Sequence, residues 1–511
     1  MLSSRSGGMF ACAAALATVC SHAIAYFPNL VSVTSSAAQG NAASGEVVSS
    51  SYTRGSTISA DGRFVVFPSY ATNFASPESL GKCDVFLRDL QSGTTTRVST
   101  GLSGAEADGD SYGAMISADG RYVAFLSYAT NLVAGDSNNL ADVFVYDRLA
   151  TPSPTITLAS LSISGTQGNG HCDGPVSISA DGRYVAFRSN ANNLIGIGND
   201  TNAKDDVFVR DRQTPTTILA SVTSGGAQGN DVSLFPALSG DGSRVAFVSY
   251  ATNLVASDTN GVHDVFVHDL SGGTTVRVSV DSSGNQANAA SSAFISPWMS
   301  DDGDLVVYHS NATNLDSAMS DTNGVSDVFV HQLSTGATTR ISLDTLGGEA
   351  NDGSFSPTIS ADGRYVAFSS AATDLVSGDT NGFVDIFVCD LQSSGAVNRV
   401  SVAFDGAQGN SHSAAAAIAA DGDYVLFASG ATNIVVNDTN GFMDVFVHDR
   451  APFPCPGDVD GDGDVDFIDQ NIVLSYYGSP VPHGTMGDLN NNGTVDAVDL
   501  NIVLSYFGTS C

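Results

Sequence analysis

The sequence predicts a mainly β protein, a seven-bladed β-propeller, followed by a small all-α domain at the C-terminus. Three observations carry this prediction. One stretch recurs seven times at a nearly fixed period, each copy holds four short apolar runs, and the last part of the chain holds a duplicated motif of another kind. A period of this length is typical of repeat architectures.

The clearest copy of the repeat runs from Ser360 to Leu391. It reads SADGRYVAF, then a polar loop containing DTNG, then DIFVCDL. The aspartate of its Asp-Gly turn recurs at intervals of 58 to 62 residues, as Asp61, Asp119, Asp181, Asp241, Asp302, Asp362 and Asp421.

Four runs of the sixth copy, 357–360, 364–369, 385–389 and 398–402, are expected to be strands. They are rich in Val, Ile, Phe and Tyr and alternate with period two. An Asp-Gly pair between the first two runs is a hairpin signal, and the third and fourth join through a turn-rich connection. Four antiparallel strands in each of seven units predict a β-propeller.

The two ends of the repeat region predict how the ring closes. The seventh copy ends with DVFVHD at 444–449 and has no fourth strand. Residues 29–41, NLVSVTSSAAQGN, match the fourth-strand segments that begin at Arg277 and Arg399. We therefore expect the N-terminal strand to complete the last blade, which would leave no free sheet edge there.

Strand alternation divides the loops between two faces. The Asp-Gly turns and the short turns between third and fourth strands fall on one face. Long loops such as 249–264 and 281–297 fall on the other, here called the long-loop face. Binding residues commonly lie on such loops over a rigid scaffold, so we expect a ligand, either a polysaccharide or a protein, on the long-loop face.

The S-x-D-G turn followed by an apolar strand resembles the repeat of TolB-like propellers, over roughly residues 29 to 450. The resemblance implies that the first strand of each repeat lines the central channel. It implies no single activity, because propellers carry binding proteins, scaffolds and enzymes alike.

The N-terminus and the charge predict the compartment. Residues 1–25 are predicted to be a signal peptide, with Arg5, an apolar core and an Ala23-Ile24-Ala25 cleavage site, so the propeller is expected at 26–450. No segment is long enough for a membrane span. A net charge of −34 argues against nucleic-acid binding and fits a solvated surface and calcium ligands. We expect a secreted or extracytoplasmic protein.

The cysteines fit export. Cys455 and Cys511 bracket the last segment and are predicted to form a disulfide. Cys83, Cys172 and Cys389 belong to different blades and are expected to be buried as small apolar residues.

Polar loops repeat the motif D-T-N-G-x-x-D. Its oxygens are Asp258, Asn260, Asp264; Asp321, Asn323, Asp327; Asp379, Asn381, Asp385; and Asp438, Asn440, Asp444, with a degraded copy around Asp136. These oxygens could hold calcium, but Asx-turns that lead the chain into the next strand account better for near-identical copies.

Three histidines and the single tryptophan are other candidate site residues. His268, His331 and His448 share a third-strand position, and we expect them to be half-exposed strand residues, not metal ligands. Trp298 could stack on a sugar ring or fill the core.

The C-terminal segment carries the most specific motif. A linker at 451–456, APFPCP, precedes a predicted calcium-binding domain at 457–511. Residues 458–469 and 488–499 both have the oxygen ligands and the central glycine of a twelve-residue calcium loop, so two Ca²⁺ ions are expected. The predicted ligands are Asp458, Asp460, Asp462, Asp464 (carbonyl), Asp466 and Asp469, and Asp488, Asn490, Asn492, Thr494 (carbonyl), Asp496 and Asp499.

Each loop runs into the same helix, QNIVLSYYG or LNIVLSYFG, and no helix precedes either loop. This duplicated loop–helix resembles the type I dockerin family over 455–511. The resemblance implies that calcium orders the module and that the module docks to a cohesin-type protein.

The module departs from the family where recognition is expected. Dockerins usually carry Ser-Thr at loop positions 10 and 11 and basic residues along the helix. Those loop positions here are Phe467-Ile468 and Ala497-Val498, and the helix positions are Leu474-Ser475 and Leu504-Ser505. A different cohesin, an intramolecular contact or retention at a surface are all compatible with this pattern.

Two functions follow from the sequence. The first is a non-catalytic binding or scaffold protein. The alternative is a carbohydrate-active enzyme, a polysaccharide lyase or glycoside hydrolase, although no G-x-S-x-G or H-E-x-x-H motif is present. A unique acidic pair beside an Arg or His at the channel mouth would favour the enzyme, and near-perfect repeat symmetry would favour binding.

Overall fold

The computed structural model describes residues 28–45, 55–76, 81–292, 295–316, 319, 321–393, 395–403, 406–450, 459, 465, 467–479, 487, 489 and 494–507. The predicted signal peptide and the linker lie outside these residues. The chain forms two units, one of them spanning Phe27–Ala451 and the other containing Pro452–Cys511.

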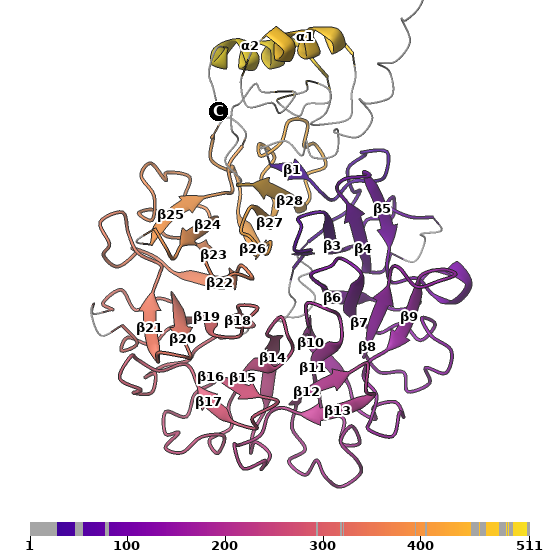
Figure 1. The fold of residues 1–511 in the computed structure, drawn as a ribbon, viewed down its shortest axis with the longest axis vertical. Helices are drawn as coiled ribbons and strands as arrows, with labels where there is room; N and C mark the ends of the chain where they lie inside the picture. Colours follow the sequence, from indigo (N-terminus) through magenta and orange to yellow (C-terminus); the bar gives the residue numbers. More distant parts are fainter. Residues whose placement is uncertain are drawn as a thin grey trace, which may run out of the picture. The chain divides into compact units, whose positions relative to one another are not determined.

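Phe27–Ala451 is a seven-bladed propeller, as predicted. Each blade is a four-stranded antiparallel sheet whose strands follow one another in order from the channel outward (Figure 1). The first three blades are β2 (Thr57–Ile58), β3 (Phe64–Ser69), β4 (Asp84–Asp89), β5 (Thr94–Arg97); β6 (Ser111–Ile116), β7 (Tyr122–Ser127), β8 (Asp142–Asp147), β9 (Thr155–Leu158); and β10 (Cys172–Ile178), β11 (Tyr184–Ser189), β12 (Asp206–Asp211), β13 (Thr216–Leu219).

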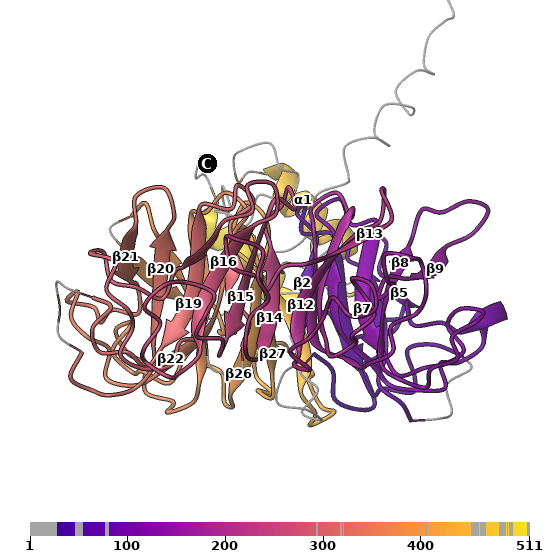
Figure 2. The same ribbon diagram turned by 90° about the horizontal axis from the view of Figure 1, so that it is seen from below.

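The fourth to sixth blades repeat this pattern. They are β14 (Ser233–Leu238), β15 (Arg244–Ser249), β16 (Asp264–Asp269), β17 (Thr275–Arg277); β18 (Trp298–Met299), β19 (Leu305–Ser310), β20 (Asp327–Gln332), β21 (Ala337–Arg340); and β22 (Ser354–Ile359), β23 (Tyr365–Ser370), β24 (Asp385–Asp390), β25 (Ala396–Arg399). Seen from the side, the strands of the propeller run between its two faces and the loops lie at those faces (Figure 2).

The seventh blade confirms the predicted closure. It consists of β26 (Ser413–Ile418), β27 (Tyr424–Ser429), β28 (Asp444–Asp449) and, from the other end of the chain, β1 (Asn29–Leu30). β1 pairs antiparallel with β28, with Leu30 opposite Phe446. The Ser32 hydroxyl then donates to Asp444 of β28.

Apolar side chains of the two middle strands form the core of each blade. An aromatic ring of the second strand stacks on a phenylalanine of the third, with ring centroids 5.7 to 6.0 Å apart. The pairs are Phe67–Phe86, Phe125–Phe144, Phe187–Phe208, Phe247–Phe266, Tyr308–Phe329, Phe368–Phe387 and Phe427–Phe446. Their burial is the main apolar contribution to each blade.

The Asp-Gly turns join neighbouring blades around the channel. Gly62 has a φ of +71°, and a Cβ at this residue would lie 2.2 Å from the ring of Tyr424 in the adjacent blade. Only glycine fits both constraints. Backbone amides of the same turns donate to the next blade: Ala60 to Ala118, Ala118 to Ala180, Ala180 to Gly240, Gly240 to Asp301, and Asp301 to Ala361, at 2.8 to 3.1 Å.

The C-terminal unit holds two helices, α1 (Phe467–Tyr476) and α2 (Ala497–Tyr506). They pack through four fully buried valines, Val465, Val473, Val495 and Val503. α2 begins with a capping box, in which Asp496 accepts from Val498 and Asp499 accepts from the Asp496 amide. No helix within the described part of the chain is both long and apolar enough to cross a bilayer.

Deleting residues 26–41 tests the closure. The deletion removes β1, the buried side chains of Val31 and Val33, and the Ser32 hydrogen bond, and it exposes the edge of β28. Each buried valine contributes roughly 1.5–3 kcal/mol, so we expect a much lower melting temperature than that of a chain starting at Tyr26. We also expect self-association through the exposed edge. A monomer that melts with the parent would contradict closure by β1.

Candidate functional site

Every third strand of the propeller begins with a buried aspartate. These residues, 0 to 1% exposed, are Asp84, Asp142, Asp206, Asp264, Asp327, Asp385 and Asp444. Each accepts a hydrogen bond from a serine that follows the fourth strand, in the same order Ser99, Ser160, Ser221, Ser279, Ser342, Ser401 and Ser32. The same serine oxygen accepts the backbone N–H of the residue after the aspartate.

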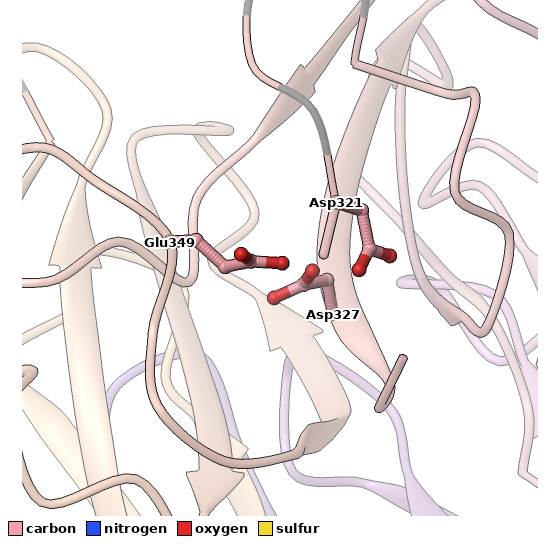
Figure 3. Close-up of side chains that lie close together, drawn as sticks. All are labelled: Asp321, Asp327 and Glu349. Atoms are coloured by element: carbon pink, nitrogen blue, oxygen red, sulfur yellow. The ribbon is translucent and has the colours of Figure 1, made fainter. Parts of the chain in front are cut away.

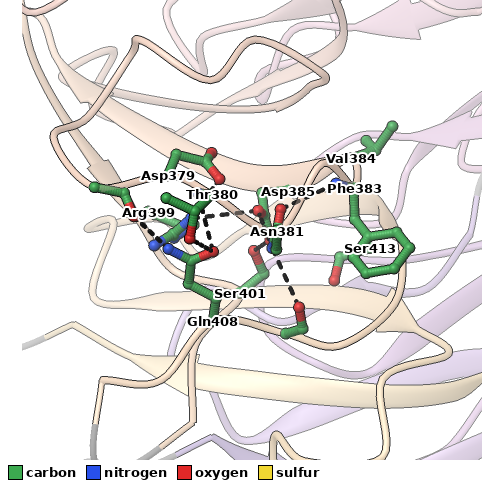
Figure 4. A network of polar contacts seen from close by, with 12 residues as sticks. Asp379, Thr380, Asn381, Phe383, Val384, Asp385, Arg399, Ser401, Gln408 and Ser413 are labelled. Atoms are coloured by element: carbon green, nitrogen blue, oxygen red, sulfur yellow. Dashed lines mark hydrogen bonds and ion pairs between the residues drawn. The ribbon is translucent and has the colours of Figure 1, made fainter.

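The D-T-N-G loops lead into these aspartates through Asx-turns. In the sixth blade, Asn381 accepts from the Phe383 amide at 3.0 Å and donates to Asp385 at 2.8 Å (Figure 4). It also donates to the Gly409 carbonyl of the following interblade loop at 3.1 Å. The loop oxygens are therefore used to hold the backbone, as the turn interpretation predicts.

A glutamine from the next interblade loop completes most of these networks. Gln167 donates to Asp136 at 2.7 Å and to Asp142 at 2.9 Å. The same side-chain amide reaches the first aspartate of the motif in other blades, in the pairs Gln228–Asp200, Gln286–Asp258 and Gln39–Asp438. The Gln167 and Gln228 amides each donate to both carboxylates of a pair, without a charged group.

An arginine of the fourth strand neutralises the acidic pair in only some blades. Arg277 lies 3.4 Å from both Asp258 and Asp264. Arg399 makes the same contacts in the sixth blade, whereas Leu158, Leu219 and Leu30 occupy the position in the second, third and seventh. Burial, together with the neighbouring Asp200 or Asp438, raises the pKa of Asp206 and of Asp444 to about 6.

The fifth blade departs from this pattern because Glu349 stands where five other blades have glutamine; the first blade has Glu106 there but lacks the D-T-N-G loop. The Glu349 carboxylate faces Asp321 and Asp327 (Figure 3), and oxygens of the three groups lie within 4.8 Å of one another. It is the one such group of three possible metal ligands among the described residues. Arg340, fully buried, contacts Asp327 at 3.0 Å and Glu349 at 3.6 Å.

Protonation can replace the missing amide donor. Burial and the adjacent Glu349 raise the pKa of the Asp321 carboxyl. Burial opposes the ionisation of Glu349, but hydrogen bonds from Thr322 and Asn323 lower its pKa to about 2. The pKa values of the two carboxyls therefore move apart, with that of Asp321 raised and that of Glu349 lowered, so Asp321 is protonated before Glu349 as pH falls.

A second departure from the repeat lies at the long-loop end of the third blade. Arg188, near the end of β11, contacts Asp205 at 2.8 Å and Asp173 of the inner strand β10 at 3.6 Å. The same register position holds Pro68, Leu126, Val248, His309, Ser369 and Ala428 in the other blades. The arginine in YVAFRS is a visible break in the repeat, but the sequence alone does not place it beside Asp173 and Asp205.

The third-strand histidines are more buried than expected. His268 and His331 are each 5% exposed, and their Nδ1 atoms bond to the Thr275 and Thr338 hydroxyls at 2.8 and 2.9 Å. His448 is partly buried. The expectation of half-exposed residues was wrong for His268 and His331, because the adjacent interblade loop covers this side of the strand: Thr275 donates to Val222 and Thr338 to Val280.

Trp298 and the cysteines of the propeller pack as small parts of its apolar core. Trp298 is partly buried and packs on the apolar cluster of the fifth and sixth blades, which favours packing over stacking on a sugar. Cys83, Cys172 and Cys389 are buried free thiols, as predicted, and burial raises their pKa. Cys455 and Cys511 lie outside the described residues.

The described residues include four of the twelve calcium ligands predicted for the C-terminal module. Asp469 and Asp499, the last ligands of the two loops, are fully buried, and Thr494 and Asp496 lie just before α2. Residues 456–508 contain no Lys or Arg, so buried carboxylates here fit a bound cation. The other predicted ligands, Asp458, Asp460, Asp462, Asp464, Asp466, Asp488, Asn490 and Asn492, lie outside the described residues.

Fold and site define a seven-bladed β-propeller joined to a small helical module. Residues 456–508 match the family model of the dockerin type I domain, so the C-terminal module is a dockerin domain. Type I dockerin domains bind calcium, and such a domain implies a cohesin partner. A search of curated proteins gives no match to the chain.

Several solved structures are similar to the propeller at low sequence identity. An oligogalacturonate lyase in complex with manganese is 13% identical, with a TM-score of 0.46, over 81% of this chain and 91% of that one. An oligogalacturonate lyase from Vibrio parahaemolyticus is 13% identical, with a TM-score of 0.47, over 83% and 97%. A putative TolB from Agrobacterium tumefaciens is 16% identical, with a TM-score of 0.37, over 70% and 95%.

Glu349→Gln tests the carboxylate cluster. The amide would donate to Asp321 and Asp327 as its counterparts do, and we expect a gain of roughly 1–2 kcal/mol in unfolding free energy at pH 7. Because folding raises the pKa of Asp321, the parent is stabilised at low pH and loses that stability as pH rises. Folding also lowers the pKa of Glu349 to about 2, so Glu349 stays ionised between pH 7 and pH 5 and its contribution hardly changes there. The gain should therefore shrink from pH 7 to pH 5, as measured by urea unfolding at both pH values.

The reverse substitution is the matched control. Gln286→Glu introduces the same carboxylate into the fourth blade, beside Asp258. It should destabilise the propeller at pH 7 and less so at pH 5. Equal unfolding free energies for Glu349→Gln and the parent at pH 7 would show that the cluster is already neutralised.

Proposed function

We propose that the protein is a secreted, non-catalytic binding protein that its dockerin domain attaches to a cohesin-type partner. The propeller presents its long-loop face to a polysaccharide or protein ligand. The single observation that carries the proposal is the dockerin domain at 456–508. Dockerin proteins are typically extracellular, which agrees with the signal sequence expected at residues 1–25.

Two calcium ions would order the docking module. The twelve predicted ligands are Asp458, Asp460, Asp462, Asp464, Asp466 and Asp469, and Asp488, Asn490, Asn492, Thr494, Asp496 and Asp499. The buried Asp469 and Asp499 tie each ion to the start of a helix. Without the ions, nine carboxylates and no Lys or Arg would share this short segment, so the module would lose its fold.

The long-loop face suits binding because its loops are rigidly held. Six of the seven blades fix the loop before the third strand through asparagine bonds to the next interblade loop, by Asn138, Asn202, Asn260, Asn323, Asn381 and Asn440. Loops held in one conformation lose little entropy when a ligand binds.

A carbohydrate-active enzyme is the second candidate, and one observation favours it. Asp173 and Asp205 form an acidic pair with Arg188, and the other blades hold no arginine at the position of Arg188. In an enzyme, Arg188 would hold an anionic group of the substrate and one aspartate would act as a general base.

Calcium dependence tests the docking proposal. The full chain should bind type I cohesin modules in calcium and lose binding in excess chelator, because the loops repel themselves without the ion. Asp469→Asn combined with Asp499→Asn should weaken calcium binding by at least tenfold, measured by calorimetry. Cohesin binding that persists in chelator would contradict the proposal.

A polysaccharide panel separates binding from catalysis. The full chain is incubated with insoluble polysaccharides, and the supernatant is assayed for reducing ends and for the absorbance of unsaturated products. We expect retention without release. Release that grows with time and falls at least about 100-fold in Arg188→Gln would establish the enzyme instead.

A further inference from the structure

The two helices of the dockerin domain expose side chains at equivalent positions. On α1 these are Phe467, Ile468, Asn471, Leu474 and Ser475, and on α2 they are Ala497, Val498, Asn501, Leu504 and Ser505. The apolar members are well exposed, with Phe467 at 68%, Ile468 at 51%, Leu474 at 46%, Val498 at 45% and Leu504 at 48%. We call these two sets the outer faces of α1 and α2.

The outer faces offer few polar groups to a partner. The Ser475 and Ser505 hydroxyls donate to the Asn471 and Asn501 carbonyls of their own helices, both at 2.6 Å. The acidic residue of each helix, Asp469 or Asp499, is fully buried on the opposite side. Apart from the two asparagine amides and the acceptor lone pairs of the two serine oxygens, the outer faces are therefore apolar and uncharged.

Each helix is apolar on both sides. Val473 and Val503 fill the interior of the module, while Leu474 and Leu504, one residue later, point outward. A helix that is apolar all round is normally buried, and clustered exposed apolar side chains mark an interaction site. The exposed rings of Phe467 and Phe507 also pack edge to face, with centroids 4.9 Å apart, so the patch continues from one helix to the other.

We propose that the outer faces dock to a cohesin-type module whose receiving surface is itself apolar and uncharged. This inference rests on the docking function proposed above and specifies the chemistry of its partner. Residues 456–508 contain no Lys or Arg, so an acidic receiving surface would find no counter-charge. A receiving surface rich in hydrogen-bonding groups would be desolvated against Leu and Ile without compensation. An apolar receiving surface avoids both of these costs.

The test compares two cohesin modules as probes, one with an apolar and one with a charged receiving surface, and measures binding of the full chain in calcium by calorimetry. We expect the apolar cohesin to bind at least about 100-fold more tightly. Its affinity should hold in 1 M sodium chloride and rise in ammonium sulfate, since apolar contacts are strengthened by sulfate.

Variants assign the contact to the outer faces. Leu474→Asp combined with Leu504→Asp should weaken binding to the apolar cohesin at least about 100-fold, because both copies then present a charge. The matched control, Leu474→Met with Leu504→Met, keeps an apolar surface and should bind within about threefold of the parent. Helical circular dichroism in calcium must be equal in the parent and in both variants, which separates lost contact from lost fold.

The outcomes distinguish the inference from the function on which it rests. Binding that prefers the charged cohesin, or that survives the double aspartate variant, would overturn the apolar partner and leave docking intact. Calcium-dependent self-association of the chain that is lost in the aspartate variant would assign the faces to a second copy or to the propeller instead. Failure of every cohesin to bind in calcium would remove the docking function itself.

Discussion

Seven buried carboxylates organise the propeller. An aspartate at the start of each third strand cannot be left unsatisfied in a dry interior, and the surrounding sequence follows from that requirement. A serine bonds one oxygen, an asparagine of the preceding loop bonds the other in most blades, and a residue of the next interblade loop completes the set. Each aspartate thus connects its own strand, the loop before it and the link to the next blade. The long-loop face is ordered as a consequence.

Most of the fold was predictable because the same pattern of four strands occurs seven times along the chain. The number of blades, the strand order and the closure by residues 29–41 follow from a period and from one missing strand. The Asx-turns were predictable from residue type alone. The burial of His268 was not, because it depends on a loop of the neighbouring blade that local alternation does not contain.

The sites were less predictable than the fold, since they lie where the repeat is broken. In the fifth blade, Glu349 stands where five other blades have glutamine, and the change replaces an amide donor with a third carboxylate that faces Asp321 and Asp327. Arg188 replaces a small or apolar residue in another. A consensus of the seven copies hides residues that differ in a single copy. Only the structure shows that Arg188 lies between Asp173 and Asp205. The calcium loops are the opposite case, because their ligands are close in sequence and need no tertiary contact to be recognised.

The closing strand has a consequence for the order in which the molecule can be completed. Ser32 and Asp444 are separated by 412 positions along the chain, yet they lie in one sheet. A ribosome releases β1 long before β28 exists, so the first strand has no partner until nearly the whole ring has been made. The contact between β1 and β28 closes the longest loop in the propeller, so its formation costs the most chain entropy. This contact therefore forms last. Until β1 pairs with β28, the edge of blade seven is open. Nascent or truncated chains are therefore the forms of this protein most prone to associate edge to edge with other sheets.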